Sequence, residues 1–264
     1  MFNLEICKTF FQLLHRDFYI FGKRLKTYGI NHLIIYPLLA ILIFGYVQPG
    51  VIFGAGSAKA SIILMVGTFA LNSVQICFSL ISPLMYDIEG DRFIDYQMML
   101  LPPRVLFFEL IAFPALFSFI IAMPFFPLAR LLLPSYFDAL NTSWLGLVLM
   151  NLISSYFFAS YVLMAMCFIK RSFNVRYFWI RINGPLVVLG GFWVPWTLLN
   201  SRFKIYSWLA LLNPYTYITE GLRSALVGND QFIAYPICIL ALLFISGVFN
   251  IVALYYFKKK MDHV

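Results

Sequence analysis

Six long apolar stretches, separated by short polar segments, dominate the chain. They lie near residues 30–47, 60–82, 105–126, 143–169, 182–199 and 234–257. A helix needs about 20 mostly apolar residues to cross the roughly 30 Å hydrocarbon layer of a bilayer, so each stretch is long enough for one crossing. The pattern predicts an all-α integral membrane protein with six transmembrane helices, organised as a single transmembrane domain over residues 1–264.

The segment before the first stretch, residues 6–28, is amphipathic. Apolar residues recur at helical spacing from Ile6 to Leu25, and Lys8, Arg16 and Lys23 lie on the opposite face. This pattern is typical of a helix that lies in the membrane interface with its cationic face towards the headgroups. Two interpretations remain open, a generic basic anchor and an elbow helix that also touches a cytoplasmic partner.

The connection after the second stretch, residues 85–103, combines acidic and apolar residues. Asp87, Asp91 and Asp95 are spaced four residues apart, which places them on one face of a helix. An apolar run follows over residues 98–101 and ends at Pro102 and Pro103, because proline cannot continue a helix interior. The segment predicts a short helix that docks in a groove of another protein. A solvated connecting helix and a carboxylate metal site are the alternatives.

The connection before the last stretch, residues 200–233, contains apolar segments too short to cross a bilayer. They are interrupted by Asn213-Pro214 and Gly221, and Glu220 and Arg223 are spaced to pair on one helix face. Irregular backbone at membrane depth persists only where it is buried in protein or lines a wet cavity. We therefore expect outer re-entrant helices here.

The composition excludes whole classes of protein. Hydrophobic residues make up 62% of the 264 positions and charged residues only 11%, against about 25% charged residues in soluble domains. The net charge of +8 is too sparse for a nucleic-acid-binding face. Most of the 19 Lys and Arg residues fall in segments on one side of the membrane if both ends are cytoplasmic. This distribution predicts cytoplasmic termini, because cytoplasmic loops retain positive charge.

Catalytic and cofactor motifs are missing from the sequence. It contains no H-E-x-x-H zinc motif and no G-x-S-x-G nucleophile elbow, and the glycine-containing residues 54–61 do not match a phosphate-binding loop. The four cysteines have no paired spacing, which favours small buried apolar residues over metal ligands. We therefore expect no enzyme activity and no cofactor in this chain, and any ATP-driven function would need a separate ATPase.

A few polar residues lie inside the apolar stretches. Interhelical hydrogen bonding is one interpretation, and a wall of a dimer interface or transport path is the other. Glu109, early in the third stretch, is an ionisable residue at membrane depth and hence a functional candidate. The candidates for the interface or path are Asn72, Gln75, Ser79, Asn151 and Ser155.

The order of these segments resembles the permease subunits of type-2 ATP-binding-cassette (ABC) exporters. The most specific match is LNPYTYITEGLRSALVG at residues 212–228, and LGGF at residues 189–192 is a weaker one. A third match covers residues 89–102, although Phe93-Ile94 stand where the family usually has Gly-Thr. The signature residues of the first match are Asn213, Pro214, Tyr217, Glu220, Gly221 and Arg223.

The resemblance implies a subunit of the bacterial inner membrane that forms the translocation path as a homodimer. Residues 85–103 would be the coupling helix, docked on two cytoplasmic ABC ATPase subunits that hold ATP and Mg. Membrane lipid would surround the complex, with no nucleic acid, and the cargo would be amphipathic, such as a lipid-linked glycan, a lipid or a drug-like molecule. The alternatives are an intramembrane, metal-dependent, lipid-modifying transferase and an ATP-independent secondary transporter. The residues expected to couple to the ATPase are Glu89, Asp91, Arg92, Asp95, Met98, Met99 and Pro102.

Overall fold

The computed structural model describes residues 4–23, 29–47, 58–90, 93–137, 142–228 and 232–262. Within these ranges the chain is helical and has no strand. The elements are α1 (Leu4–Lys23), η1 (Ile30–Ile35), α3 (Tyr36–Ala40), η2 (Ile41–Val47), α5 (Ala58–Ile81), α6 (Pro83–Glu89), α7 (Phe93–Leu100), α8 (Pro103–Ala122), α9 (Phe125–Leu132), α10 (Pro134–Phe137), α11 (Trp144–Phe168), η3 (Ser172–Asn174), α12 (Val175–Phe178), η4 (Trp179–Asn183), α13 (Gly184–Leu189), α14 (Trp196–Arg202), α15 (Lys204–Leu211), α16 (Pro214–Val227) and α17 (Tyr235–Asp262).

Five helices in the described part of the chain are long and apolar enough to cross a membrane. They coincide with five of the six stretches expected from the sequence, so the multi-pass, all-helical class is confirmed. The five are Ile30–Val47, Ser61–Glu89, Pro103–Leu132, Trp144–Phe168 and Tyr235–Lys260.

The remaining stretch, residues 182–199, is not one helix, and the sequence-based prediction is wrong on this point. The helix begins earlier, at Val175, and ends at Leu189, before a turn that contains Gly190 and Gly191. Gly191 has a φ of 75°, a conformation that residues with a Cβ rarely adopt. A new helix, α14, starts only after Pro195.

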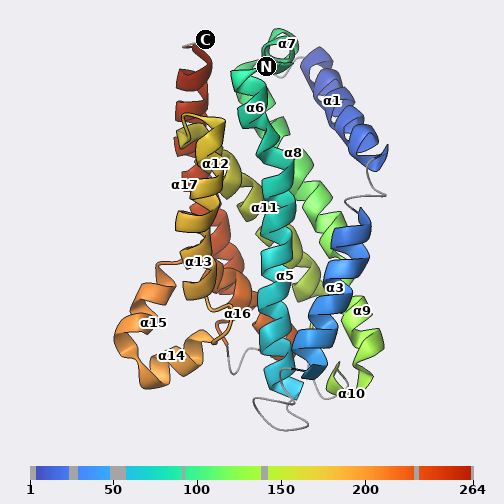
Figure 1. Cartoon of the computed structure of the whole chain (residues 1–264), viewed down its shortest axis with the longest axis vertical. Coiled ribbons are helices and arrows are strands. Elements are labelled where there is room, and N and C mark those ends of the chain that lie inside the picture. The colour runs from blue at the N-terminus through green and yellow to red at the C-terminus, as the bar shows by residue number, and fades with distance from the viewer. Residues whose placement is uncertain are drawn as a thin grey trace.

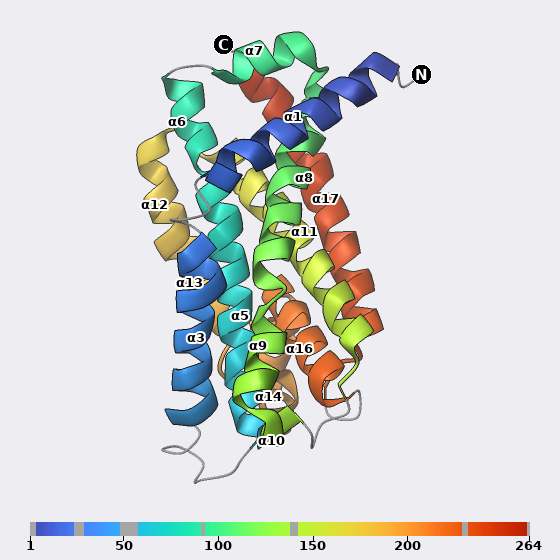
Figure 2. The same ribbon diagram turned by 90° about the vertical axis from the view of Figure 1, so that its right-hand side faces the viewer.

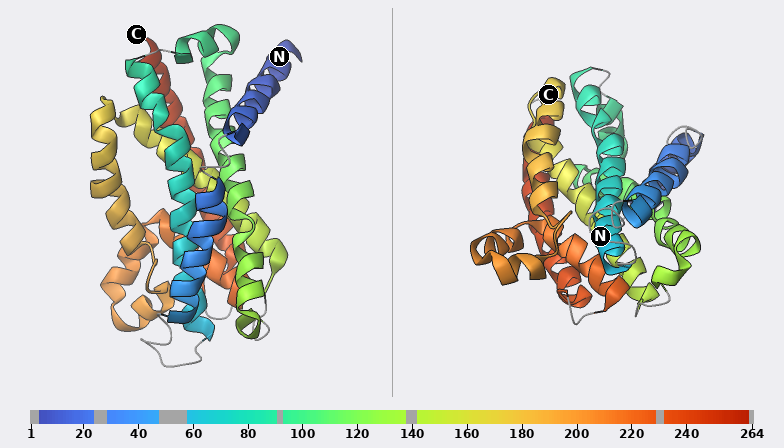
Figure 3. Two further views of the ribbon diagram at one scale, coloured as in Figure 1. Left: turned by 45° about the vertical axis from the view of Figure 1, so that its right-hand side comes forward. Right: turned by 60° about the horizontal axis from the view of Figure 1, so that its bottom comes forward.

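The long helices form an elongated bundle around α11, which packs against α5, α8, α16 and α17. The N-terminal helix, the C-terminal end of α17 and α7 all lie at one end of the bundle (Figures 1 and 2). The opposite end carries α10 and the α14–α15 hairpin, which stands out at the side of the bundle (Figures 1 and 3). The two ends of the molecule therefore carry different kinds of element.

The amphipathic N-terminal segment is helical, as expected, over Leu4–Lys23. It runs obliquely beside α8 (Figure 2). Phe18 and Phe21 each place their rings 5.2 Å from the Phe113 ring of α8, measured between centroids. Residues 24–28 of the expected segment lie outside the described part of the chain.

Two of the five polar candidates, Asn72 and Asn151, join helices of the same chain. The Asn72 Oδ1 lies 2.7 Å from the His32 Nδ1, which ties α5 to the first long helix. The Asn151 amide donates to the Phe119 carbonyl of α8 at 3.2 Å. Ser155 is fully buried, and Gln75 and Ser79 are half-buried. For Asn72 and Asn151 these bonds favour the packing interpretation.

Candidate functional site

The expected coupling segment consists of two helices. Helix α6 ends at Glu89, the chain turns at Gly90, and α7 begins at Phe93. The Asp87 carboxylate caps α7 by accepting from the backbone N–H groups of Phe93 at 2.9 Å and Ile94 at 2.8 Å. The prediction that the three aspartates share one helix face is therefore wrong, because Asp87 and Asp95 belong to different helices. Asp91 and Arg92 lie outside the described residues.

Helix α7 buries one face and exposes the other. Ile94 is 1% exposed, the half-buried Met98 packs against the same core, and Leu101, directly after the helix, is also buried. The opposite face exposes large apolar side chains, among which Met99 is 82% exposed. We call this face the α7 surface, formed by Phe93, Tyr96, Met99 and Leu100.

Neighbouring elements hold the α7 surface in place. The Arg16 guanidinium of α1 lies 5.4 Å from the centroid of the Phe93 ring, a cation–π contact. Glu89 accepts from the Ser172 backbone N–H at 2.6 Å and from its hydroxyl at 2.5 Å. Pro102 is exposed and ends the segment immediately before α8, as expected from the sequence. The α7 surface is therefore contacted by α1, and the connection between α11 and α12 is bonded to the end of α6 that precedes α7.

A buried ion pair lies towards the other end of the bundle. The Arg223 Nη1 and the Glu220 Oε1 are 3.1 Å apart, and both side chains are fully buried. The Arg223 Nη2 also donates to the carbonyls of Gly191 at 2.6 Å and Ile63 at 2.9 Å. Glu220 accepts from the Trp196 backbone N–H at 3.0 Å. One pair thus joins α16 to α5 and to the turn that ends α13.

Three further residues, from α16 and its N-terminal cap, form hydrogen bonds to the helix that ends at Leu189 and to the turn after it. The Asn213 side chain donates to the Leu186 carbonyl at 2.7 Å and accepts from the Tyr215 N–H, which caps α16. The Tyr215 hydroxyl donates to Asn183, and the Thr219 hydroxyl donates to the Gly190 carbonyl at 2.9 Å. We call Asn213, Tyr215, Thr219, Glu220 and Arg223 the polar cluster.

The other signature residues shape α16 itself. Pro214 occupies the first turn of the helix, where its missing N–H is no loss. The Tyr217 hydroxyl donates to the Leu211 carbonyl at 2.8 Å. A Cβ added at Gly221 would lie 2.9 Å from the Cys238 Cβ of α17 and would also displace the end of the Met150 side chain, so glycine permits the close approach of α16 and α17. The two separate sequence matches, residues 189–192 and 212–228, therefore meet in space.

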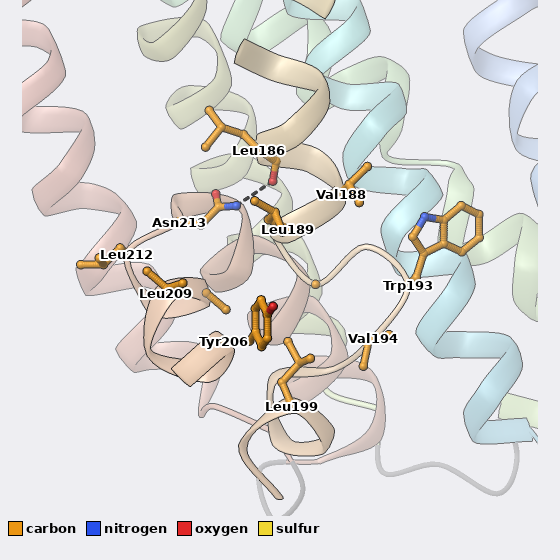
Figure 4. A pocket seen from close by; sticks show the side chains of 12 residues that line it. Leu186, Val188, Leu189, Trp193, Val194, Leu199, Tyr206, Leu209, Leu212 and Asn213 are labelled. Carbon is orange, nitrogen blue, oxygen red and sulfur yellow. Dashed lines mark hydrogen bonds between the residues drawn. The ribbon is translucent and has the colours of Figure 1, made fainter. Parts of the chain in front are cut away.

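An apolar groove of about 560 Å³ opens beside the turn. Its wall comes from α13, the turn and the α14–α15 hairpin, and Figure 4 shows Asn213 bonded to Leu186 at its edge. Leu189, Trp193, Tyr206 and Leu209 are among the lining residues. Such a surface suits apolar or amphipathic molecules.

One helix connects the two regions. The span Ser61–Glu89 has 29 residues, which corresponds to about 43 Å of α-helix. Near one end, the Ile63 carbonyl accepts from Arg223. Near the other end, Asp87 caps α7. This span therefore contacts α7 at one end and the polar cluster at the other.

Glu109 is fully buried in α8, and neither carboxylate oxygen has a hydrogen-bond partner in the described part of the chain. It lines a cavity of about 120 Å³ together with Asp17 of α1. Across the described ranges, no group of three or more His, Cys, Asp or Glu residues is arranged to hold a metal ion.

The sequence matches no protein-family model, and no curated protein and no solved structure matches it.

Several contacts of the site could not be read from the sequence pattern. Asp87 as a cap of α7 and Glu89 as an acceptor from Ser172 depend on the break at Gly90. The bonds of Arg223 to Ile63 and Gly191 join residues that are far apart in the chain. The i, i+3 spacing of Glu220 and Arg223 was the one local signal, and it indicated the ion pair that forms.

Proposed function

We propose that this chain is the membrane-spanning permease subunit of an ATP-driven ABC exporter. Two copies form the translocation path in the bacterial inner membrane, and two cytoplasmic ABC ATPase subunits dock on them. The ATPases supply ATP binding and hydrolysis, with Mg, and this chain supplies the path.

The α7 surface is the observation that supports this proposal most strongly. Four large apolar side chains are exposed there, at the end of the bundle that carries both ends of the described chain. Along the sides of the bundle, lipid would cover the exposed apolar side chains. At the end of the bundle, where α7 lies, exposed apolar side chains would face water unless another protein covered them. An exposed apolar cluster marks a site of interaction with a protein or a membrane, and a short amphipathic helix at this end of the bundle is suited to a hydrophobic groove of a partner.

The topology of the proposal has six crossings with both termini in the cytoplasm. The fifth crossing is the helix from Val175 to Leu189, built from segments of four, five and six residues. At about 1.5 Å per residue it is shorter than the hydrocarbon layer, so the turn and the α14–α15 hairpin complete the crossing as re-entrant elements. The polar cluster donates hydrogen bonds to the carbonyls of Leu186, Gly190 and Gly191, which makes this irregular backbone more tolerable at membrane depth.

The coupling step of the proposal uses the contacts at the two ends of Ser61–Glu89. ATP binding moves the docked α7, Asp87 transmits the displacement to α6 and α5, and the Ile63 carbonyl passes it to Arg223. The apolar groove beside the turn then changes shape, which exposes it to amphipathic cargo on alternate sides. ATP gives this cycle a direction because it binds the two states with different affinity.

The experiment is purification of the tagged chain from its native membranes in a mild detergent, followed by an ATP-hydrolysis assay and photolabelling with azido-ATP. We expect azido-ATP to label a co-purifying soluble-type subunit and not this chain. Photolabelling of this chain itself by azido-ATP, or cargo transport by the chain reconstituted alone, would reject the proposal.

A further inference from the structure

A second apolar groove separates the C-terminal part of α11 from the helix that begins at Val175. It encloses about 490 Å³, within the roughly 300–1,000 Å³ typical of small-ligand sites. Phe168, Tyr177 and Ile182 are 47%, 39% and 51% exposed, so the groove lies on the outer surface of the bundle. It is distinct from the groove beside the polar cluster.

The one charged residue that lines this groove is Arg181. Its guanidinium lies 4.7 Å from the centroid of the Tyr177 ring, and no carboxylate in the described part of the chain pairs with it. Its N–H donors are therefore left for an external acceptor. Asn174 adds an amide donor at the rim of the groove.

The surrounding charge has the same sign. Lys170, Arg171 and Arg176 lie on the same connection, and its acidic neighbour Glu89 is bonded to Ser172. Arg181 follows Val175 by six residues, which places it about 9 Å along the helix. A long cationic side chain at that depth reaches the headgroup region while its stem lies against apolar surface.

We propose that this groove binds one acidic phospholipid, with its phosphate paired to Arg181 and one acyl chain lying against Tyr161, Met164 and Phe168. The lining is apolar apart from a cation, an amide and phenol hydroxyls. An acidic phospholipid complements this lining, because its acyl chain matches the apolar residues and its phosphate matches the cation. Basic pockets between transmembrane helices bind anionic headgroups by the same chemistry. The inference requires only that the bundle is embedded in lipid, and it stands whether or not the chain belongs to an exporter.

The test uses the full chain in nanodiscs that contain equal amounts of phosphatidylcholine and phosphatidylglycerol. A photoactivatable group on the acyl chain of either lipid labels the protein, and the labelled peptides are mapped. We expect the phosphatidylglycerol probe to label peptides from 161–168 and 177–182. We expect Arg181→Gln to lower this labelling about fivefold, the effect of one cation near an anionic surface. Arg181→Lys should retain most of it.

Arg130→Gln is the matched control, because Arg130 also lies over an aromatic ring, that of Trp144, and belongs to α9, which Figure 1 shows away from α12 and near the opposite end of the bundle. This variant should label like the wild type. Equal labelling by the phosphatidylcholine probe, or unchanged phosphatidylglycerol labelling in Arg181→Gln, would overturn the proposal. If Arg181→Gln does not fold, the two probes compared on the wild-type protein and on Arg181→Lys decide the question in the same way.

Discussion

The polar cluster and the α7 surface depart in opposite ways from the rule that polar side chains are exposed and apolar side chains are buried. In the polar cluster, charged and polar side chains are buried, and Arg223 is bonded to Glu220 and to backbone carbonyls of two other segments. On the α7 surface, large apolar side chains are exposed at an end of the bundle. The polar cluster is bonded to several other segments of the chain, whereas on the α7 surface Phe93 is contacted by Arg16 of α1 and Met99 remains 82% exposed. The contacts of the polar cluster join α16 to α5 and to the turn, and we propose that the α7 surface binds another protein.

The largest expected effect is on the polar cluster. Arg223→Ala removes four hydrogen bonds and leaves the Glu220 carboxylate buried without its cation. Removing one partner of a buried pair typically costs about 3–5 kcal/mol. We expect a large fall in thermal stability, measured by tryptophan fluorescence in detergent. The control Arg202→Ala, at the exposed end of α14, should change little. A loss of stability as small as that of the control would contradict the structural role of the cluster.

A smaller effect is expected from crowding the turn. A Cβ at Gly190 would collide with Tyr215 and lie 2.8 Å from the Leu186 carbonyl. Overpacking of this kind costs about 1–3 kcal/mol, so Gly190→Ala should lower the unfolding temperature. Gly247→Ala is the control, because nothing lies within 4 Å of a Cβ there and alanine favours the helix by about 0.5–1 kcal/mol. Opposite signs for the two variants support the close contact between the turn and α16.

The span Ser61–Glu89 connects the polar cluster with α7, and its contact with α7 can be weakened at Asp87. Asp87→Ala removes the cap of α7 at a cost of about 1 kcal/mol, while Asp87→Asn keeps a capping oxygen. We expect slower, less complete protection of α7 amides in hydrogen exchange for the alanine variant, and near wild-type protection for the asparagine variant. Unchanged exchange in both variants would show that Asp87 does not position α7.

The sequence predicted the class of fold well and the internal contacts poorly. Five apolar stretches form long helices, as predicted. They were predictable because a continuous run of apolar residues is enough to identify a helix of this length, and such a run is visible in the local sequence. Residues 182–199 misled the prediction, because hydropathy does not register that Gly191 adopts a positive φ and that Pro195 separates two helices. Likewise, the i, i+4 spacing of the aspartates assumed a helix that Gly90 interrupts. The ion pair was predictable from its local spacing, whereas its bonds to Ile63 and Gly191 depend on the packing of distant segments.

The smallest expected effect on stability is that of Met99→Asp, the variant that tests whether an ATPase binds the α7 surface. Met99 is 82% exposed, so Met99→Asp should change the free energy of unfolding by no more than about 0.5 kcal/mol. The same change places a carboxylate in the centre of the α7 surface. Met99→Leu, which keeps the apolar contact, is the matched control.

The most direct measurement is the ATP-hydrolysis activity that co-purifies with each of these variants from native membranes, normalised to the amount of this chain. The account predicts that the wild type and Met99→Leu retain the activity and that Met99→Asp, folded to the same extent, loses most of it. Equal activity with all three proteins would show that no ATPase binds through the α7 surface.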